Sequence, residues 1–444
     1  MHEMQWGLLA PEWLSNERRT RTLDLGVAVR TFNDLAVPGM GGVWFGRQLF
    51  LATLGVAVAQ AARARNMVVS NIETANAIEA LACLLALRAT RWESNERLRG
   101  AQKMRGTTAL TFAQARQRSF YVTQPMRMAT VQALPALGLV SSSGEQFNSY
   151  ACTPQGYELI SRMCHGSAPR HQTVLDYLTG WVLGQYEIGE KSPSLLAVLS
   201  PLELLPLSVR EWLREQLEMG SGSMSQRRRD TLRWMDKLYR SGPRTVDWHL
   251  PAAEISDADH WRDLHVGALF FQTRDAAIAL LEAVEVVMSP AVVRQLPLQQ
   301  ALPGQLAEKL AALRTCAGNF LLQQYDPTPD NLASTFCMEC HGADDAMLLR
   351  NLVQRDGQVL QLRAERIIPG AAFRAMLDPS LGAAHAAPRS DEESGIETAV
   401  DTSSMPIFPD GISRRIPNFF YLNLDLHGER APRMPLTELG GVLS

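Results

Sequence analysis

The chain has 444 residues, of which 46% are hydrophobic and 20% charged, an ordinary globular composition that excludes a mainly disordered protein. Its 43 basic and 46 acidic residues leave a formal net charge of -3, so the bulk charge does not indicate a nucleic-acid partner. Six cysteines scattered over so long a chain exclude a secreted disulfide scaffold, and the length predicts two to four domains at roughly 100–200 residues each.

Residues 1–104 are predicted to form a helical N-terminal domain. Ser70 and Glu73 have the spacing of a capping box, and apolar residues recur at helical intervals after them. The N-terminus lacks the basic start and apolar core of a signal peptide, and the apolar run after Gln48 is too short to cross a bilayer. We therefore expect a cytoplasmic protein with no membrane partner.

A glycine-rich loop precedes this helix, with the sequence Val37-Pro38-Gly39-Met40-Gly41-Gly42. Two interpretations remain open. The loop is either a plain turn between helices, or its glycines allow the backbone to approach a ligand beside Trp44. No phosphate-binding or dinucleotide motif follows the loop.

The most specific pattern lies between residues 105 and 165. Thr123 can cap a short helix whose buried stripe is Val131, Leu134 and Leu137, and Gly138 ends it. A strand then begins at Leu139-Val140, a turn follows, and residues 146–152 are predicted as the second strand of a hairpin. Thr153-Pro154-Gln155-Gly156 opens a closing helix.

The order helix, Leu-Gly-Leu-Val, hairpin, Thr-Pro-x-Gly, helix resembles the winged-helix repressors of the MarR and ArsR type. In those proteins the first helix enters the major groove of DNA and the hairpin forms a wing. The resemblance implies that Gln124, Arg127 and Thr130 face the DNA, and that Arg116 and Arg118 approach its backbone from the preceding helix. Pro135 departs from the pattern and predicts a kink or stop near Leu134.

Local charge agrees with this expectation. Residues 88–127 contain nine basic and two acidic side chains, a net charge of +7, which could neutralise phosphates. Only four of the 43 basic residues of the chain are lysines, and a GC-rich genome explains that arginine bias as well as phosphate binding does. A protein-docking surface and an inert fold element remain the alternatives to DNA contact.

The rest of the chain is predicted in four parts. Residues 171–300 form a helical domain, residues 301–378 a helical region with a small hairpin, residues 379–405 an acidic disordered linker, and residues 406–444 a C-terminal strand and tail. The expected elements are helices at 207–218, 226–240, 256–288, 305–324 and 330–354, hairpin strands at 358–362 and 365–368, and a strand at 418–426.

Three groups of side chains are candidates for chemistry. Cys337-Met338-Glu339-Cys340-His341 matches the haem-attachment pattern and half of a zinc site that His341 or Cys316 would extend, but we expect buried thiols without metal. Residues of the other two groups are expected to be structural: Asp257, His260, Asp263 and His265 at a helix start, and the adjacent pair Cys164-His165.

These observations predict a mainly α, multi-domain helical protein with a winged helix-turn-helix embedded at residues 105–170 and little β-sheet. The predicted function is that of a non-enzymatic, DNA-associated component of a larger bacterial assembly, without cofactor or metal, with double-stranded DNA and other proteins as partners. A subunit of a mobile-element or phage-defence system fits this architecture. The alternatives are a scaffold whose winged helix docks a protein, and an enzyme whose site the sequence does not reveal.

Overall fold

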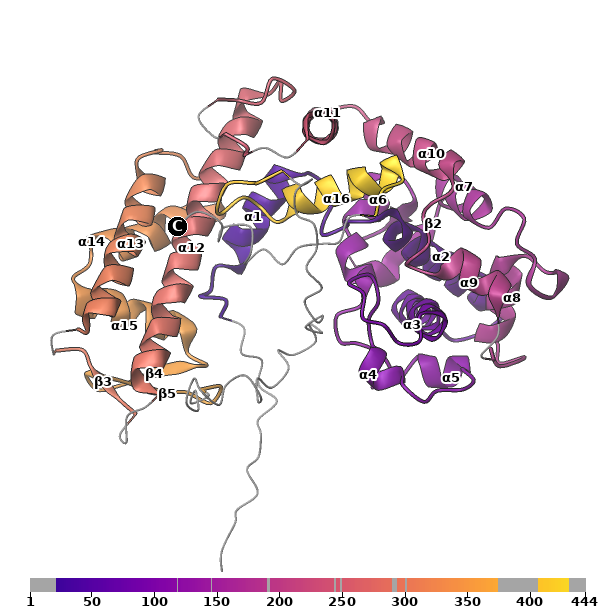
Figure 1. The fold of residues 1–444 in the computed structure, drawn as a ribbon, viewed down its shortest axis with the longest axis horizontal. Coiled ribbons are helices and arrows are strands. Elements are labelled where there is room, and N and C mark those ends of the chain that lie inside the picture. Colours follow the sequence, from indigo (N-terminus) through magenta and orange to yellow (C-terminus); the bar gives the residue numbers. More distant parts are fainter. Residues whose placement is uncertain are drawn as a thin grey trace, which may run out of the picture. The chain divides into compact units, whose positions relative to one another are not determined.

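The computed structural model of the chain describes residues 21–373 and 406–430, apart from 118, 145, 190–191, 243–244, 248–249, 290–293 and 300–301. This described part is mainly helical and carries two small antiparallel sheets (Figure 1). The prediction of a mainly α, multi-domain chain with little β-sheet is therefore confirmed.

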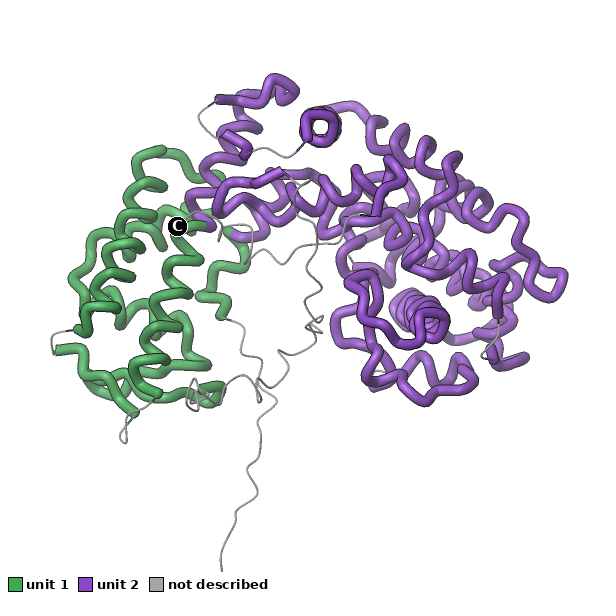
Figure 2. The backbone as a smooth tube through the Cα atoms, in the orientation of Figure 1, with its two compact units in different colours: residues 1–28, 272–390 green, residues 29–271, 391–444 purple. Residues whose placement is uncertain are grey.

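Two compact units divide the chain (Figure 2). Unit 1 comprises residues 1–28 and 272–390, and unit 2 comprises residues 29–271 and 391–444. Neither residue 104 nor residue 170 separates these two units, and one hydrophobic core contains buried side chains from both sides of each position. The boundary predicted near residue 300 falls instead at residue 271, and the predicted acidic linker lies outside the described residues.

Unit 2 contains most of the helices. In chain order its elements are α1 (Gly26–Ala36, which begins in unit 1), α2 (Gly46–Ala64), α3 (Asn71–Ala89), α4 (Ala101–Met104), α5 (Phe112–Ala115), the 3-10 helix η1 (Met126–Thr130), α6 (Ala133–Ala136), β1 (Val140–Ser142), η2 (Phe147–Ser149), β2 (Tyr150–Cys152), α7 (Pro154–Met163), η3 (Pro169–His171), α8 (Val174–Val182), α9 (Pro193–Leu199), α10 (Leu207–Glu218), α11 (Ser223–Ser241), the first part of α12 (Ala258–Met288) and α16 (Arg415–His427).

The core of unit 2 is built on α2 and α3, which pack along each other and are buried over most of their length. The predicted capping box starts α3: the Glu73 carboxylate accepts from the Ser70 backbone N–H at 3.0 Å, and the Ser70 hydroxyl accepts from the Glu73 N–H at 3.2 Å. Because α2 also contacts η1, β2, α7 and α8, it lies at the centre of the unit.

Several arginines stabilise the ends of helices by donating to backbone carbonyls. The buried guanidinium of Arg47 donates to carbonyls at the end of α9 and in the following loop, including that of Leu204 at 3.1 Å, and burial lowers the pKa of Arg47 to about 10. Arg228 donates to the carbonyls of Leu217 and Met219, at 3.0 and 2.8 Å, where α10 ends. Terminal carbonyls lack partners within their own helix, so these side chains satisfy them.

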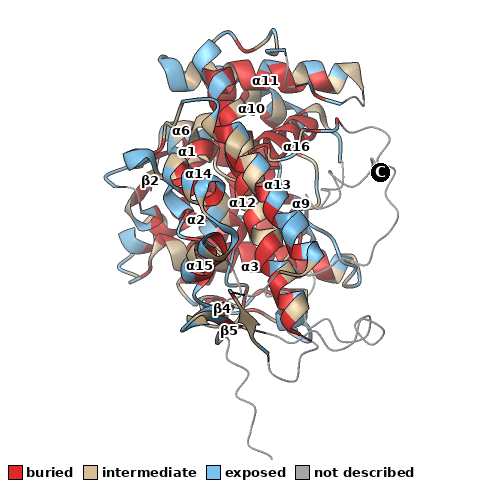
Figure 3. Cartoon of the chain, turned by 90° about the vertical axis from the view of Figure 1, so that its left-hand side faces the viewer, coloured by how far each residue is buried: buried red, intermediate tan, exposed pale blue. Residues whose placement is uncertain are grey.

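The C-terminal segment of unit 2 differs from its prediction. Residues 418–426, expected as a strand, belong to helix α16, which is buried along nearly its whole length (Figure 3). A helix buried on all sides has no amphipathic period, so an apolar run alone does not distinguish it from a buried strand. A helix also satisfies its own backbone hydrogen bonds and needs no neighbouring strand to be buried.

Unit 1 contains the rest of α12, the strand β3 (Leu296–Pro297), α13 (Gly304–Leu321), η4 (Pro329–Asn331), α14 (Leu332–Gly342), α15 (Asp345–Asp356), β4 (Leu360–Arg363) and β5 (Arg366–Pro369). The predicted hairpin is confirmed as β4 and β5, and β3 adds a third strand in the order β3-β5-β4. The single helix predicted over 330–354 is wrong: α14 ends at Gly342, and Asp344 then caps α15, with its carboxylate accepting from the Met347 N–H at 2.8 Å.

A smaller correction concerns the start of α12. The helix was predicted from residue 256, but it begins at Ala258, and the Ser256 hydroxyl donates to the Asp230 carboxylate at 2.6 Å. That carboxylate is buried on α11 and also accepts from the Ser256 backbone N–H at 3.0 Å. The serine therefore ties the chain before α12 to α11.

Candidate functional site

The 105–165 segment contains the predicted hairpin and closing helix, but not the first helix as one continuous element. β1 and β2 pair antiparallel with Val140 opposite Cys152, and the Thr153 hydroxyl starts α7 by accepting from the Gly156 N–H at 3.1 Å. The second strand is shorter than predicted, because Phe147–Ser149 forms a 3-10 turn. Helix α3 packs against α5 and η1, and α6 packs against η1 and β1. The three short helices α5, η1 and α6 therefore lie together with the hairpin.

The helix expected to read DNA is divided into the 3-10 turn η1 and the single turn α6. Pro135 lies in the first turn of α6, where its missing N–H leaves no hydrogen bond unmade. Leu134 and Leu137 are buried as predicted, and Val131 is half-buried. The segment therefore presents a short, bent surface where a straight recognition helix was expected.

Two of the residues predicted to face DNA have inward contacts. Thr130 was expected at the surface but is fully buried, and its hydroxyl donates to the Arg127 carbonyl at 2.8 Å. The Arg127 side chain donates from Nε to the Asn76 carboxamide at 2.5 Å and lies 5.3 Å from the centre of the Phe147 ring. Burial lowers the pKa of Arg127. Both residues thus contact other groups of unit 2, and Arg127 remains partly exposed.

The other predicted contact residues lie at the edge of the segment. Gln124 is exposed. Arg116 is half-buried and forms an ion pair with Glu73, its Nε donating to Oε1 at 3.1 Å. Arg118 lies outside the described residues. Arg116 and Arg127 thus both contact α3. Arg116 neutralises Glu73, and Arg127 donates a hydrogen bond to Asn76.

Glu79 is the central polar residue of this region, and sequence reasoning missed it. Its carboxylate is buried on α3 and accepts from the Met126 N–H at 2.6 Å, the Arg127 N–H at 3.0 Å and the Tyr121 hydroxyl at 2.9 Å. Burial raises the pKa of Glu79 above its ordinary value. The carboxylate caps the start of η1, as a side chain from outside a helix can do. Its position could have been noticed in the sequence, because Glu79 falls on the same face of the predicted helix as the apolar residues and so indicates a buried carboxylate.

The glycine-rich loop before α2 covers one face of η1 and α6. The Gly42 N–H donates to the Ala129 carbonyl at 3.1 Å. A Cβ at Gly41 would lie 2.5 Å from the oxygen of Ala129, and one at Gly39 would lie 2.6 Å from the Cβ of Ala136. Both glycines have positive φ, +57° and +73°. The close approach that these glycines allow is therefore made to the helical pieces of the 105–165 segment, and not to a ligand.

The part of η1 and α6 that faces solvent is uncharged. Met128 has an exposed fraction of 53%, and Pro135 is also exposed. Gln132, between them in sequence, is half-buried and donates to the Asp34 carboxylate at 2.9 Å. The two exposed side chains, Met128 and Pro135, offer no donor fork to a base or a phosphate.

The candidate thiols lie in unit 1. Cys337 and Cys340 are buried on α14, while Cys316 on α13 is half-buried. Burial raises the pKa of Cys340 to about 12 and the pKa of Cys337 further. The His341 ring contacts the Arg314 carbonyl at 3.2 Å. Among the described residues no three His, Cys, Asp or Glu side chains are arranged to hold a metal ion.

The acidic and histidine cluster at the start of α12 is held by one arginine. Arg227 of α11 forms ion pairs with Asp257 at 2.9 Å and Asp263 at 2.7 Å. His260 is fully buried, with its Nε2 at 3.0 Å from the Ala36 carbonyl, and burial lowers its pKa. These contacts join α11, α12 and the end of α1, while His165 of the Cys164-His165 pair is exposed.

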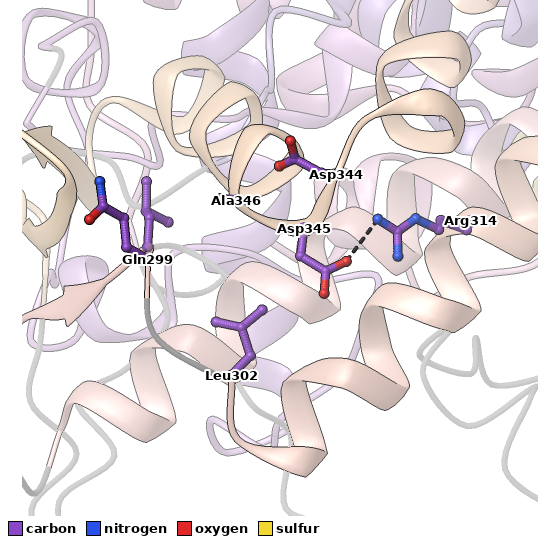
Figure 4. Close-up of a pocket in the computed structure, with 7 residues that line it drawn as sticks. Gln299, Leu302, Arg314, Asp344, Asp345 and Ala346 are labelled. Atoms are coloured by element: carbon purple, nitrogen blue, oxygen red, sulfur yellow. Dashed lines mark ion pairs between the residues drawn. The ribbon is translucent and has the colours of Figure 1, made fainter.

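A hollow of about 520 Å³ opens in unit 1 between α13 and α15 (Figure 4). Its charged lining is already paired: Arg314 forms an ion pair with Asp345 at 2.8 Å, and Asp344 caps α15. Gln299 and Leu302 complete its edge. The hollow therefore offers no unpaired group around which a reaction could be built.

None of the helices described is both long enough and apolar enough to cross a membrane. Comparison of the chain with protein families, curated proteins and solved structures found no match. Its function is therefore inferred from its own residues.

Proposed function

We propose that the chain is a non-enzymatic component of a larger protein assembly, and that its 105–165 segment docks a protein partner. One observation carries the proposal. The helical pieces that would read DNA in a winged-helix repressor are covered on one face by the loop at Gly39–Gly42, and their exposed side chains, Met128 and Pro135, are uncharged.

Reading of DNA by this segment would require side chains that are otherwise engaged. Freeing Arg127 would break its hydrogen bond to Asn76, and moving η1 outward would remove the donors that satisfy the buried Glu79 carboxylate. Each buried polar group left without a partner costs about 1–3 kcal/mol. A protein partner can be bound without any such change, because Met128 already projects into solvent and methionine adapts to varied apolar surfaces.

We propose a non-enzymatic role because the candidate catalytic side chains are already engaged in ion pairs and helix caps or are buried. The carboxylates of Asp257 and Asp263 are paired with Arg227, and those of Asp344 and Asp345 cap a helix and pair with Arg314. The Cys337 and Cys340 thiols are buried and their pKa values are raised, which opposes formation of nucleophilic thiolates. These groups serve the fold.

Site-specific photo-crosslinking in source cells tests the docking surface. A photoreactive amino acid at position 128 should form an adduct of discrete mass, and the same amino acid at Val68, which is 89% exposed in the loop before α3, should not. Met128→Glu should release the chain from its assembly in nuclease-treated extracts, and Val68→Glu should not. Retention of the Met128→Glu protein in an assembly of unchanged size would refute the proposal.

A further inference from the structure

Unit 2 has a second surface on which basic side chains are exposed, whereas Arg127 of the 105–165 segment points toward α3. This second surface follows α3 and comprises Arg91, Arg99, Lys103 and Arg105, which we name the basic ledge. Arg91, Lys103 and Arg105 are exposed, and Arg99 is half-buried. The short helix α4 carries Lys103 and packs against α3 (Figure 1), so the ledge is anchored to the most buried helix pair of the unit.

The backbone turns sharply at the start of the ledge. Arg91 and Trp92 both have left-handed backbone angles, with φ of 56° and 66°, a conformation that side chains other than glycine, Asn and Asp rarely adopt. The turn brings the Trp92 ring under the Arg105 guanidinium, whose carbon lies 5.8 Å from the ring centre. Arg105 is thereby held on an aromatic surface, which limits its motion while leaving it exposed.

The other two cations are held in place by carbonyls. Lys103 donates from Nζ to the Tyr121 carbonyl at 3.1 Å, and Arg99 donates from Nη1 to the Gln124 carbonyl at 2.5 Å. Arg99 also lies close enough to the buried Glu79 carboxylate to interact with it electrostatically. The ledge therefore has three cations held in place, Arg99, Lys103 and Arg105, beside the exposed Arg91. The exposed carboxylates of Glu93 and Glu96 lie on the same loop.

Three other basic residues described in this stretch are engaged elsewhere. Arg97 pairs with the buried Asp425, Arg88 donates to the Thr107 carbonyl, and Arg116 pairs with Glu73. The ledge cations, unlike Arg88, Arg97 and Arg116, stay at the surface. Several exposed cations close together in the chain suit a polyanion whose charges are regularly spaced.

We propose that the basic ledge binds the phosphodiester backbone of duplex DNA without reading its sequence. The guanidinium groups of Arg91 and Arg105 would each form paired hydrogen bonds with phosphate oxygens, and Lys103 would act as a point charge beside them. This surface is distinct from the docking surface at Met128, so each can fail without the other.

Fluorescence anisotropy of the full chain with a labelled duplex, measured from 50 to 200 mM salt, tests the proposal. Three phosphate contacts predict a slope of log affinity against log salt of about −2.7, which is roughly a 40-fold loss of affinity over that range. The double variant Arg91→Gln, Arg105→Gln should lower the slope to about −1 and weaken all sequences alike. Glu93→Gln should strengthen binding by about two- to fivefold, because it removes an anion from the ledge.

A matched control removes the same charge elsewhere. Arg233 and Arg240 are exposed on α11, so the double variant Arg233→Gln, Arg240→Gln should leave the slope unchanged. Thermal melting of every variant establishes that it is folded. Failure of the wild-type chain to bind duplex at micromolar concentration in low salt would overturn the proposal. An equal loss of affinity in both double variants would overturn it too, since it would indicate attraction by overall charge.

Discussion

Arg97 and Asp425 form a buried ion pair, with Nη1 donating to Oδ1 at 2.9 Å, although 328 residues separate them in the chain. The other oxygen of Asp425 accepts from the Gly46 N–H at 2.9 Å, at the start of α2. The Arg97 guanidinium lies 4.8 Å from the centre of the Phe45 ring. One carboxylate of α16 thus neutralises a buried cation and caps the central helix of unit 2.

Replacing Asp425 by Asn should destabilise the protein strongly. The substitution leaves the Arg97 cation buried without a counter-charge, for which we expect a loss of about 3–5 kcal/mol in the free energy of unfolding. Urea denaturation measures this quantity. Asp259→Asn is the control, because both side chains of the Asp259–Arg262 pair at 2.8 Å are at least half exposed and the pair should contribute less than about 1 kcal/mol. Equal stability of the two variants would show that α16 is not held by this pair.

Adding a methyl group at Gly41 should destabilise the protein more than adding one at Gly138. Gly41→Ala should lose about 2–4 kcal/mol, because the new Cβ meets the Ala129 carbonyl oxygen and the φ of +57° is unfavourable for alanine. Gly138→Ala shares the positive φ, +67°, but has open space around the added Cβ, so it should lose only about 1–2 kcal/mol. Equal losses would show that the loop yields to the extra methyl.

Glu79→Gln should destabilise unit 2 by about 1–3 kcal/mol at pH 7. An amide offers one acceptor oxygen, and its NH₂ group faces one of the donors that the carboxylate now satisfies. The control is Glu158→Gln, which breaks only an exposed pair with Arg162 on α7 and should change stability by less than about 0.5 kcal/mol.

The same residue predicts a dependence of stability on pH. Burial raises the pKa of Glu79 above its ordinary value of 4.5, so the folded protein binds this proton more tightly than the unfolded chain does. The resulting stabilisation is fully present below the unfolded-state pKa and is lost as the pH rises through the folded-state pKa. From about pH 4.5 upward, the wild-type free energy of unfolding should therefore fall relative to that of Glu79→Gln. A difference that is constant with pH would show that Glu79 does not titrate differently in the two states.

Local signals in the sequence predicted several elements well. The Ser70 and Glu73 pair marked the start of α3, the helix at Leu207–Glu218 has its predicted ends, and the hairpin after α15 is present. Each of these depends on residues within a few positions of one another, so the chain itself carries the information.

The tertiary contacts of the candidate site were beyond such reasoning. The arginines between residues 88 and 127 were predicted as one cationic surface, but Arg97 is neutralised by Asp425 and Arg127 is held by Asn76 of α3. Which cations remain exposed depends on partners tens to hundreds of positions away, and no local spacing reveals them. For the same reason the burial of α16 could not be read from its composition.

The thiols of α14 should be unreactive in the folded protein. Cys337 and Cys340 are buried and burial raises the pKa of both, so few thiolates form at pH 8 and an alkylating reagent has little access to them. Mass spectrometry after brief treatment with iodoacetamide should find Cys316 alkylated well before these two. In denaturant all six cysteines should react alike. Elemental analysis addresses the zinc alternative: stoichiometric zinc that is lost in Cys337→Ser would show that protection comes from metal ligation and not from burial.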